Sequence, residues 1–219
     1  MELGGDMTMI ASNASAGENL GLKAEGEMEL LSGENSTFER SVTQDGGLLE
    51  TQTHISESYN EDVVSTSLNA GDDLLINAES GAEGISAWDQ AEGDVTLEGV
   101  QASAGNRVFG YAGGDMNVLP ARSRSYEHNE TRTSLSGVAG GLAAAAQLSL
   151  EATLPGASSA IDTELASSES RGSGSTRLTG TSISSGSGTT LLAGGDANIV
   201  AGDVGAGQNA RMKADNLGL

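Results

Sequence analysis

The sequence predicts an all-β fold, a right-handed parallel β-helix with coils of about 21 residues. Triplets of the form apolar-x-apolar follow Gly-acid or Gly-Asn turns, and they recur at a spacing of 21 residues. A second triplet divides several of these periods into 13 and 8 residues. The 219 residues also include 32 glycines and only 3% aromatic residues, which disfavours both an α-solenoid and an ordinary globular core.

The first series of triplets begins at Met7, and Met28 follows it after 21 residues. Val95 and Met116 repeat this spacing further along the chain. Alternation of apolar and polar residues is the period of a strand with one buried side, so these four side chains are expected to point inward. The middle residue of each triplet is polar and is expected to face water, at Thr8, Glu29, Thr96, Asn117, Arg177 and Asn198.

The same spacing extends the series to weaker triplets. Leu49 follows Met28 after 21 residues, Leu74 precedes Val95 by 21, and Thr176 precedes Ala197 by 21. We therefore expect the members of each pair to occupy equivalent positions in successive coils.

The second triplet places a further strand in each coil. Leu20 lies 13 residues after Met7 and 8 before Met28, and Val108 divides its period in the same way. Coils that contain two or three short strands stack through parallel pairing, with about 4.8 Å between neighbouring strands.

Gly-Gly-Asp recurs at residues 4–6, 113–115 and 194–196. Calcium-binding β-rolls use a nine-residue repeat with two glycines ahead of each Gly-x-Asp, and this chain has neither that spacing nor the second Gly-x-Asp. Glycine and aspartate also suit tight corners. The sequence therefore favours structural turns over a calcium site.

Two segments depart from the repeat within what we expect to be a single β-helix over 1–219. They are insertions at about 32–69 and 120–172, where strands or hairpins are expected to leave or widen the coil. In the second insertion, 137–146 is rich in Gly and Ala, and 148–154 alternates like a strand. Either the insertion folds against the side of the helix, or it is a hairpin used for contacts. The candidate contact or translocation residues are Arg122, Arg124, Tyr126, Arg132, Leu142, Leu148, Leu150 and Leu154.

Composition excludes several functions. The 31 acidic and 10 basic residues give a formal charge of −21, which disfavours nucleic-acid binding because phosphates are repelled. The chain has no cysteine, so disulfides and thiolate metal sites are excluded. His54 and His128 lack a metal-ligand pattern. Acidic clusters such as 57–62 lack a supporting set of aromatic sugar platforms, since Trp88 is the only tryptophan. We expect no catalytic residue, cofactor or metal.

Several phrases carry a family resemblance. Residues 4–11, 70–78 and 194–199 are similar to the A-G-G-D-h-x-h-x-A units, in which h is apolar, of filamentous haemagglutinin repeats. The stretch from Gly46 to Asp72 and the passage from Arg122 to Ser175 resemble the second class of these repeats. The resemblance covers almost the whole chain.

The resemblance implies a role as well as a fold. Such proteins are large bacterial exoproteins exported by two-partner secretion, either adhesins or effectors of contact-dependent growth inhibition. It implies a secreted or cell-surface location, an outer-membrane two-partner secretion transporter as one partner, and a target-cell receptor or outer membrane as another. No cap is evident at either end of the repeat, so we expect this chain to be a fragment of a longer solenoid.

The function expected from these features is a non-catalytic stalk that extends and presents adhesive or toxin modules. The first alternative is an active module for toxin translocation across the target-cell outer membrane, which deletion of 137–155 from the parent protein would test. The second alternative is a carbohydrate-active β-helix enzyme, which turnover of a glycan panel would test.

Overall fold

The computed structural model describes residues 1–47, 50–79, 93–135, 166–200 and 202–218. Every regular element in these ranges is a β-strand. The chain divides into two compact units, of which the first comprises 1–35, 61–123 and 176–219, and the second comprises 36–60 and 124–175. Within the described ranges, no helix is long and apolar enough to cross a membrane.

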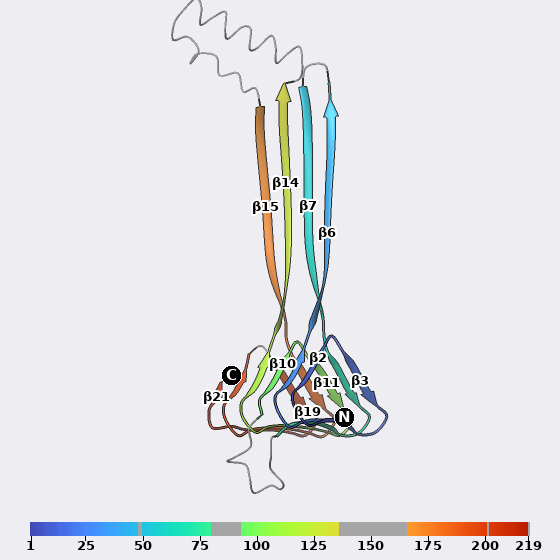
Figure 1. Ribbon diagram of the computed structural model, residues 1–219, viewed down its shortest axis with the longest axis vertical. Helices are drawn as coiled ribbons and strands as arrows, with labels where there is room; N and C mark the ends of the chain where they lie inside the picture. The colour runs from blue at the N-terminus through green and yellow to red at the C-terminus, as the bar shows by residue number, and fades with distance from the viewer. Residues whose placement is uncertain (48–49, 80–92, 136–165, 201, 219) are drawn as a thin grey trace, which may run out of the picture. The chain divides into compact units, whose positions relative to one another are not determined.

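Three parallel sheets form the first unit, and Figure 1 shows their strands stacked beside one another. Sheet A contains β1 (Glu2–Leu3), β4 (Leu20–Ala24), β9 (Leu74–Ala78), β12 (Arg107–Ala112), β17 (Gly188–Ala193) and β20 (Asn209–Lys213). Sheet B contains β2 (Met7–Ile10), β5 (Met28–Leu31), β10 (Val95–Glu98), β13 (Met116–Leu119), β18 (Ala197–Ile199) and β21 (Leu217–Gly218). Sheet C contains β3 (Asn13–Ala16), β8 (Ser67–Ala70), β11 (Gln101–Ala104), β16 (Ser182–Ser185) and β19 (Asp203–Ala206).

The described strands visit sheets B, C and A in that order five times, and each passage adds one strand to every sheet. We call one such passage a winding. Because each strand pairs in parallel with its counterpart in the next winding, the arrangement is compatible with a parallel β-helix. The all-β expectation is confirmed, and the antiparallel sheet of the second unit is an additional element.

The first series of triplets forms a continuous column in sheet B. Met7 pairs with Met28, Met28 with Val95, and Val95 with Met116. All four side chains are at most 2% exposed. Five of the six expected polar positions form the adjacent outward column in the same strands, from Thr8 through Glu29, Thr96 and Asn117 to Asn198. The expected coil position is wrong for Arg177, which lies in a strand of the antiparallel sheet.

Two expected register pairs are wrong. Leu74 does not align with Val95 but pairs with Leu20 and Val108 in sheet A, so it belongs to the second triplet series. Ala197 pairs with Met116, whereas Thr176 lies in a strand of the second unit's sheet. Both errors have one cause: a fixed spacing cannot reveal register across an insertion of unknown length. The expected partner Leu49 lies outside the described residues.

The Gly-Asp turns form the corner between sheets A and B. Here the carboxylates of two aspartates accept a hydrogen bond from a backbone N–H of the next winding: Asp94 Oδ1 from the Asp115 N–H at 2.7 Å, and Asp115 Oδ1 from the Asp196 N–H at 2.8 Å. A Cβ on Gly114 would lie 2.2 Å from Asp94 Oδ1, so the bond requires glycine in the next winding. This explains the motif as a backbone link between windings. Within the described residues, no group of acidic or histidine side chains could hold a metal ion.

Both chain excursions into the second unit leave at the corner between sheets B and C. The first connects β5 with β8, and the second connects β13 with β16. In the winding between them, Gly99 and Val100 alone connect β10 with β11, and Gly99 adopts a φ of 62°, which favours glycine.

A buried threonine marks each return from an excursion. The Thr66 hydroxyl donates to the Leu31 carbonyl at 2.6 Å and accepts from the Ser12 N–H at 3.2 Å. The Thr181 hydroxyl lies 2.8 Å from the Leu119 carbonyl and 3.2 Å from the Val100 nitrogen. Thr66 and Thr181 are 0% and 1% exposed, so the two hydroxyls satisfy backbone groups that water does not reach.

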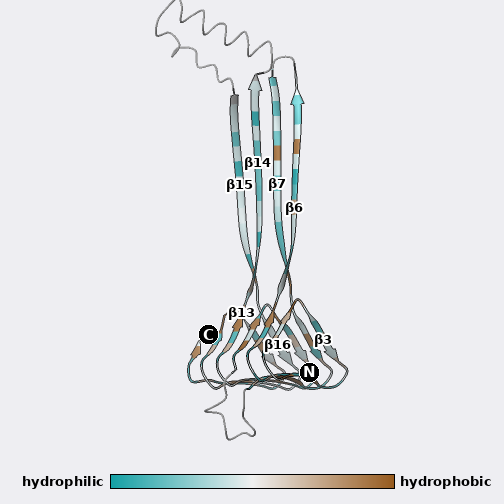
Figure 2. Ribbon diagram, viewed as in Figure 1, coloured by the Kyte–Doolittle hydropathy of each residue, from teal (hydrophilic) through white to brown (hydrophobic). Residues whose placement is uncertain are grey.

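The second unit contains a four-stranded sheet, sheet D, in the order β15-β14-β7-β6. Its strands are β6 (Gly33–Gly46), β7 (Glu50–Val64), β14 (Ala121–Leu135) and β15 (Ala166–Thr179). β7 and β14 are antiparallel, and the arrows in Figure 1 alternate in direction across the sheet. Figure 2 colours these strands mainly teal and white, with few brown bands, unlike the short strands of the first unit. The segments that contain 137–146 and 148–154 lie outside the described residues.

Candidate functional site

Sheet D has two chemically different faces. Tyr126 pairs with Tyr59, His128 with Glu57, and Glu130 with Ile55, so these side chains share one face because alternate residues of a strand point to the same side. Arg40 of β6 forms an ion pair with Glu57 at 2.9 Å, which places Arg40 on this face too. The side chains of Phe38 and Val42, two residues on either side of Arg40, therefore project from the same face. We call this the aromatic face, and its apolar members are Phe38, Val42, Ile55, Tyr59 and Tyr126.

The aromatic face is open to solvent. Phe38 is 63% exposed, Val42 54% and Tyr126 44%, while Ile55 and Tyr59 are half-buried. An antiparallel sheet commonly packs its apolar face on a core. Here that face carries large apolar side chains without burying them.

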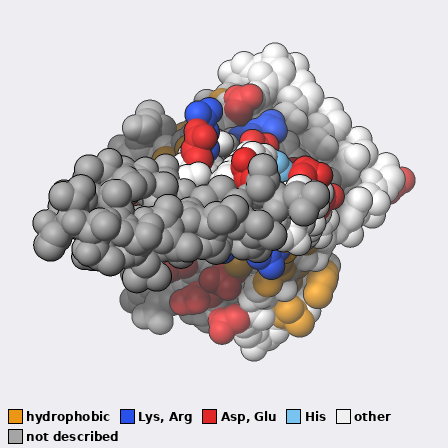
Figure 3. All heavy atoms as spheres, turned by 90° about the horizontal axis from the view of Figure 1, so that it is seen from above, with side chains coloured by type: hydrophobic (Ala, Val, Ile, Leu, Met, Phe, Trp, Pro, Cys, Tyr) orange, Lys and Arg blue, Asp and Glu red, His pale blue; other side chains and the backbone are white. Residues whose placement is uncertain are grey.

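The charges of the aromatic face are paired locally. Arg132 donates two hydrogen bonds to Glu130, at 2.7 and 3.1 Å, and Glu57 is paired with Arg40. The hydrogen bond and charge of Arg132 hold the pKa of Glu130 below its ordinary value, and Glu130 in turn raises the pKa of Arg132. Figure 3 shows basic side chains in blue beside acidic side chains in red on the side of the molecule that it presents.

Two stacked aromatic rings of β14 lie next to a glycine of β15 on this face. The rings of Tyr126 and His128 are stacked, with centroids 6.2 Å apart and planes inclined by 7°. Ser125 and Ser175 contact each other through their hydroxyls at 2.7 Å, which sets β15 beside β14. A Cβ on Gly172 would lie 3.7 Å from His128 Nδ1 and from a ring carbon of Tyr126. Because glycine has no side chain, the surface of β15 is lower than the two rings beside it.

The opposite face of sheet D is polar. His54 and Thr131 form a cross-strand hydrogen bond at 3.1 Å, and Ser56 and Asn129 are paired beside them. A shallow groove of about 550 Å³ lies over part of the sheet, lined by Ser58, Tyr59, Asn60, Ser125, Tyr126, Glu127, Ser173, Gly174 and Ser175.

The first unit has a second candidate surface, on the outer side of sheet A. Phe109 is 38% exposed and lies beside a groove of about 530 Å³ that Thr190, Leu192, Arg211 and Lys213 also line. Within the described part of the chain, Arg211 and Lys213 form no ion pair.

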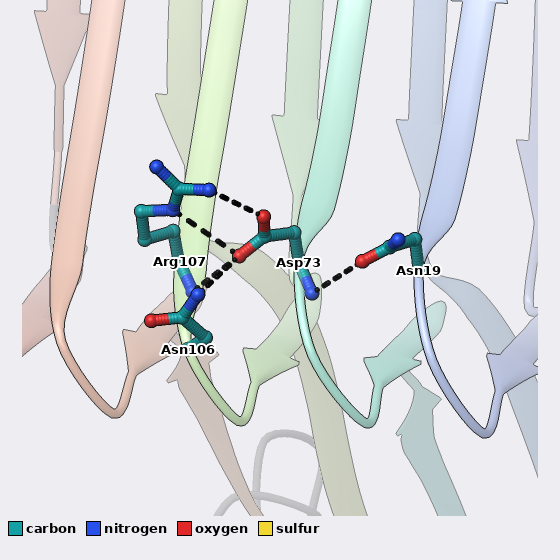
Figure 4. Close-up of polar contacts among 4 residues, drawn as sticks. All are labelled: Asn19, Asp73, Asn106 and Arg107. Carbon is teal, nitrogen blue, oxygen red and sulfur yellow. Dashed lines mark hydrogen bonds and ion pairs between the residues drawn. The ribbon is translucent and has the colours of Figure 1, made fainter.

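Asp73 and Arg107 line a neighbouring groove with Phe109 and Thr190, and they belong to a polar network whose four residues are drawn in Figure 4. Asp73 accepts four contacts: from the Arg107 guanidinium at 2.7 and 3.3 Å, from the Arg107 N–H at 3.1 Å, and from Asn106 Nδ2 at 2.9 Å. Its own N–H donates to Asn19 Oδ1 at 3.1 Å. The hydrogen bonds and charge of Arg107 lower the pKa of Asp73. The network joins residues of three successive windings, so its role is to hold the windings together.

The expected contact residues fall into two groups. Arg122, Arg124, Tyr126 and Arg132 all lie on β14, and Tyr126 and Arg132 share the aromatic face. Leu142, Leu148, Leu150 and Leu154 lie outside the described residues, so their role remains a prediction. Sequence reasoning missed Phe38, Val42, Ile55 and Tyr59. Phe38 and Val42 are four residues apart, as are Ile55 and Tyr59, and this even spacing is the signal of a strand with one apolar face.

The fold and this surface define an all-β repeat protein with stacked parallel strands and an appended antiparallel sheet. A family model described as Hemagglutinin repeat matches residues 49–219, which is more than half of the chain, and the chain belongs to this family. The expected resemblance is thereby confirmed. No curated protein and no solved structure matches the chain. Membership suggests a secreted, adhesin-type segment, and such regions are typically structural rather than enzymatic.

Proposed function

We propose that this chain is a right-handed parallel β-helical stalk segment of a large secreted bacterial protein, either an adhesin or an effector of contact-dependent growth inhibition. In this role it extends and presents adhesive or toxin modules at the cell surface. The observation that carries the proposal is the repeated register of sheet B, in which Met7, Met28, Val95 and Met116 occupy one buried column. Each winding adds about 4.8 Å of length.

The chemistry of the windings supports a spacer. Backbone ladders, the aspartate links between windings and the buried threonines all serve the stacking itself. A repeat whose units contact mainly their neighbours suits export in an unfolded form and folding outside the cell. The partners in this proposal are an outer-membrane two-partner secretion transporter and a target-cell receptor or outer membrane.

The test removes one complete winding from the parent protein. Residues 95–115 can be excised in register, because Val95 and Met116 are paired and the excision joins equivalent positions. We expect export and delivery or adhesion to persist, since a spacer shortened by about 4.8 Å still presents its modules. Excision of 95–105 is the control: it removes β10 and β11 but leaves β12, so the register fails and exported protein should be lost.

An active role predicts a different result. If the protein lacking 95–115 is exported and folded but no longer adheres or delivers, the stalk proposal is wrong for this part of the chain. Turnover of a glycan by the purified protein, lost on carboxylate substitution, would instead favour an enzyme.

A further inference from the structure

We infer that the aromatic face of sheet D is a homotypic contact surface that binds the same face of a second copy of this chain. The inference does not depend on the stalk role. It begins from Phe38, Val42 and Tyr126, which are 63%, 54% and 44% exposed on a sheet whose other face is polar. Burying such side chains is favourable by about 25 cal/mol for each Å² of apolar surface removed from water.

The charge of the aromatic face permits a second copy to approach. The chain as a whole has a formal charge of −21, so most of its surface repels another copy. On the aromatic face, however, Arg40 is paired with Glu57 and Arg132 with Glu130, and the two pairs cancel. The opposite face carries the carboxylates of Glu127 and Glu169, the second of which is paired with Arg171. The aromatic face is therefore the side of this sheet that combines apolar area with balanced charge.

The shape of the aromatic face is self-complementary. Bulky side chains, Phe38 and Val42, project from the edge strand β6, while the opposite edge strand β15 presents Gly172 and Gly174. The Ser125–Ser175 contact sets Gly174 beside Tyr126, in the row that continues through Tyr59.

When two copies face each other across a two-fold axis that is parallel to the strands, the strand order of one sheet is reversed relative to the other. Each edge strand then lies over the opposite edge strand of the second copy. In such a pair β6 of one copy lies over β15 of the other, so Phe38 is seated above the glycines. This is the isologous contact that a closed dimer requires. Four strands about 4.8 Å apart and about ten residues long give roughly 600 Å² for each copy, or about 1,200 Å² in total, the lower end of specific interfaces. We therefore expect a reversible dimer of micromolar affinity.

The first experiment measures the mass of the purified full chain by sedimentation equilibrium over a range of concentrations. The wild type should dimerise reversibly. The variant Gly174→Trp should weaken dimerisation about tenfold or more, because the indole fills the seat of Phe38. Ser173→Trp is the matched control: the same side chain, one residue away, projects from the opposite face and should leave dimerisation unchanged. A Cβ at Gly174 would come no closer than 3.5 Å to its nearest neighbour, the Ser125 carbonyl oxygen, so the tryptophan is compatible with the fold.

The second experiment uses the absence of native cysteine. Chains carrying Phe38→Cys and chains carrying Gly174→Cys are mixed under mild oxidation, and a disulfide between the two kinds of chain is expected. Within one copy the two positions lie on opposite edges of sheet D, about 14 Å apart, which is too far for a disulfide. Replacing Gly174→Cys with Ser173→Cys should abolish the cross-link. A wild type that stays monomeric throughout the micromolar range, or dimers and cross-links that do not distinguish residues 173 and 174, would overturn the inference.

Discussion

At the scale of single residues, the hydroxyl groups of Thr66 and Thr181 solve the same problem at two places. At each return from the second unit, a backbone N–H of the neighbouring winding has a threonine hydroxyl as its partner. The last carbonyl of the strand before the excursion accepts from this hydroxyl in addition to a backbone N–H. Thr66 accepts from the Ser12 N–H and donates to Leu31, and Thr181 accepts from the Val100 N–H and donates to Leu119. A buried polar group without a partner is costly, so these hydroxyls stabilise the corners from which the excursions leave.

Replacing Thr181→Val should therefore destabilise the protein by about 1–3 kcal/mol, because valine has nearly the same shape but leaves the buried Val100 N–H without a partner. Chemical denaturation monitored by circular dichroism measures the change. Thr190→Val is the control: Thr190 lies half-buried on the outer side of sheet A and makes no hydrogen bond through its hydroxyl among the described residues. Equal stability of the two variants would contradict this role for Thr181.

The carboxylate of Asp73 makes stability depend on pH in a defined direction. Arg107 lowers its pKa in the folded protein below the ordinary value of 3.8, so the folded state binds the proton less readily than the unfolded state. The contribution is therefore fully present above about pH 4 and is lost as the pH falls through the lowered pKa of the folded state.

The stability difference between the wild type and Asp73→Asn should be largest near neutral pH and should shrink in acid. Thermal unfolding across the acidic range measures it. Asp72→Asn is the matched control, since the Asp72 carboxylate makes no hydrogen bond among the described residues and its removal should leave this pH dependence intact. A difference that persists unchanged into acid would contradict the role of the Asp73 charge.

At the scale of elements, the sequence predicted the strands that repeat without interruption and failed where they are interrupted. The column through Met7, Met28, Val95 and Met116 could be predicted because apolar-x-apolar spacing directly encodes it. Leu74 was assigned to the wrong column because its distance from Val95 equals a full period by coincidence. In the structure it pairs with Leu20, 54 positions earlier.

The candidate surface was only partly predictable for a related reason. Tyr126 and Arg132 stood out by composition, yet their neighbours on the aromatic face come from a segment about 70 positions earlier in the chain, opposite them in the antiparallel ladder. Cross-strand pairing joins residues that no local pattern relates. Likewise, only the register of the strands shows that Gly99 and Val100 take the place that the excursions occupy in the neighbouring windings.

That register predicts that both excursions can be removed. Leu31 and Leu119 are equivalent to Glu98, while Ser67 and Ser182 are equivalent to Gln101. Residues 32–66 and 120–181 can therefore each be replaced by Gly-Thr, which has the length of the Gly99–Val100 connection and keeps a threonine at the positions of Thr66 and Thr181. Because long loops are entropically expensive to close, shortening them should not lower stability.

The expected product is a soluble protein that retains a β-sheet circular dichroism spectrum and unfolds cooperatively. Replacement by Gly-Val of 32–65 and 120–180, which retains Thr66 and Thr181 but adds one residue to each corner, is the control and should be less stable. A chain that fails to fold after the in-register replacement would show that the first unit depends on the second.

At the scale of the whole molecule, stability in the first unit follows from contacts between neighbouring windings. Its ladders join each winding only to the one before and the one after, and the aspartate links follow the same rule. Its core is a series of columns, in which Leu97 of the middle winding packs between Leu30 and Val118. Such a chain behaves as a linear array, and its units are stable in proportion to the neighbours that they have.

Hydrogen exchange in this 219-residue chain should therefore vary along the array rather than within each winding. Amides of β9, β10 and β12 have windings on both sides and should exchange most slowly, whereas those of β1, β2 and β20 should exchange fastest because the terminal windings lack a neighbour on one side. Leu97→Ala, which removes a side chain that is 1% exposed, should cost about 2–5 kcal/mol and speed exchange in the windings on both sides. The control Leu75→Ala removes a 38% exposed leucine of sheet A and should have a smaller effect confined to its surroundings. Uniform protection across all windings would mean that the unit unfolds as one globular domain, and the linear account of its stability would then be wrong.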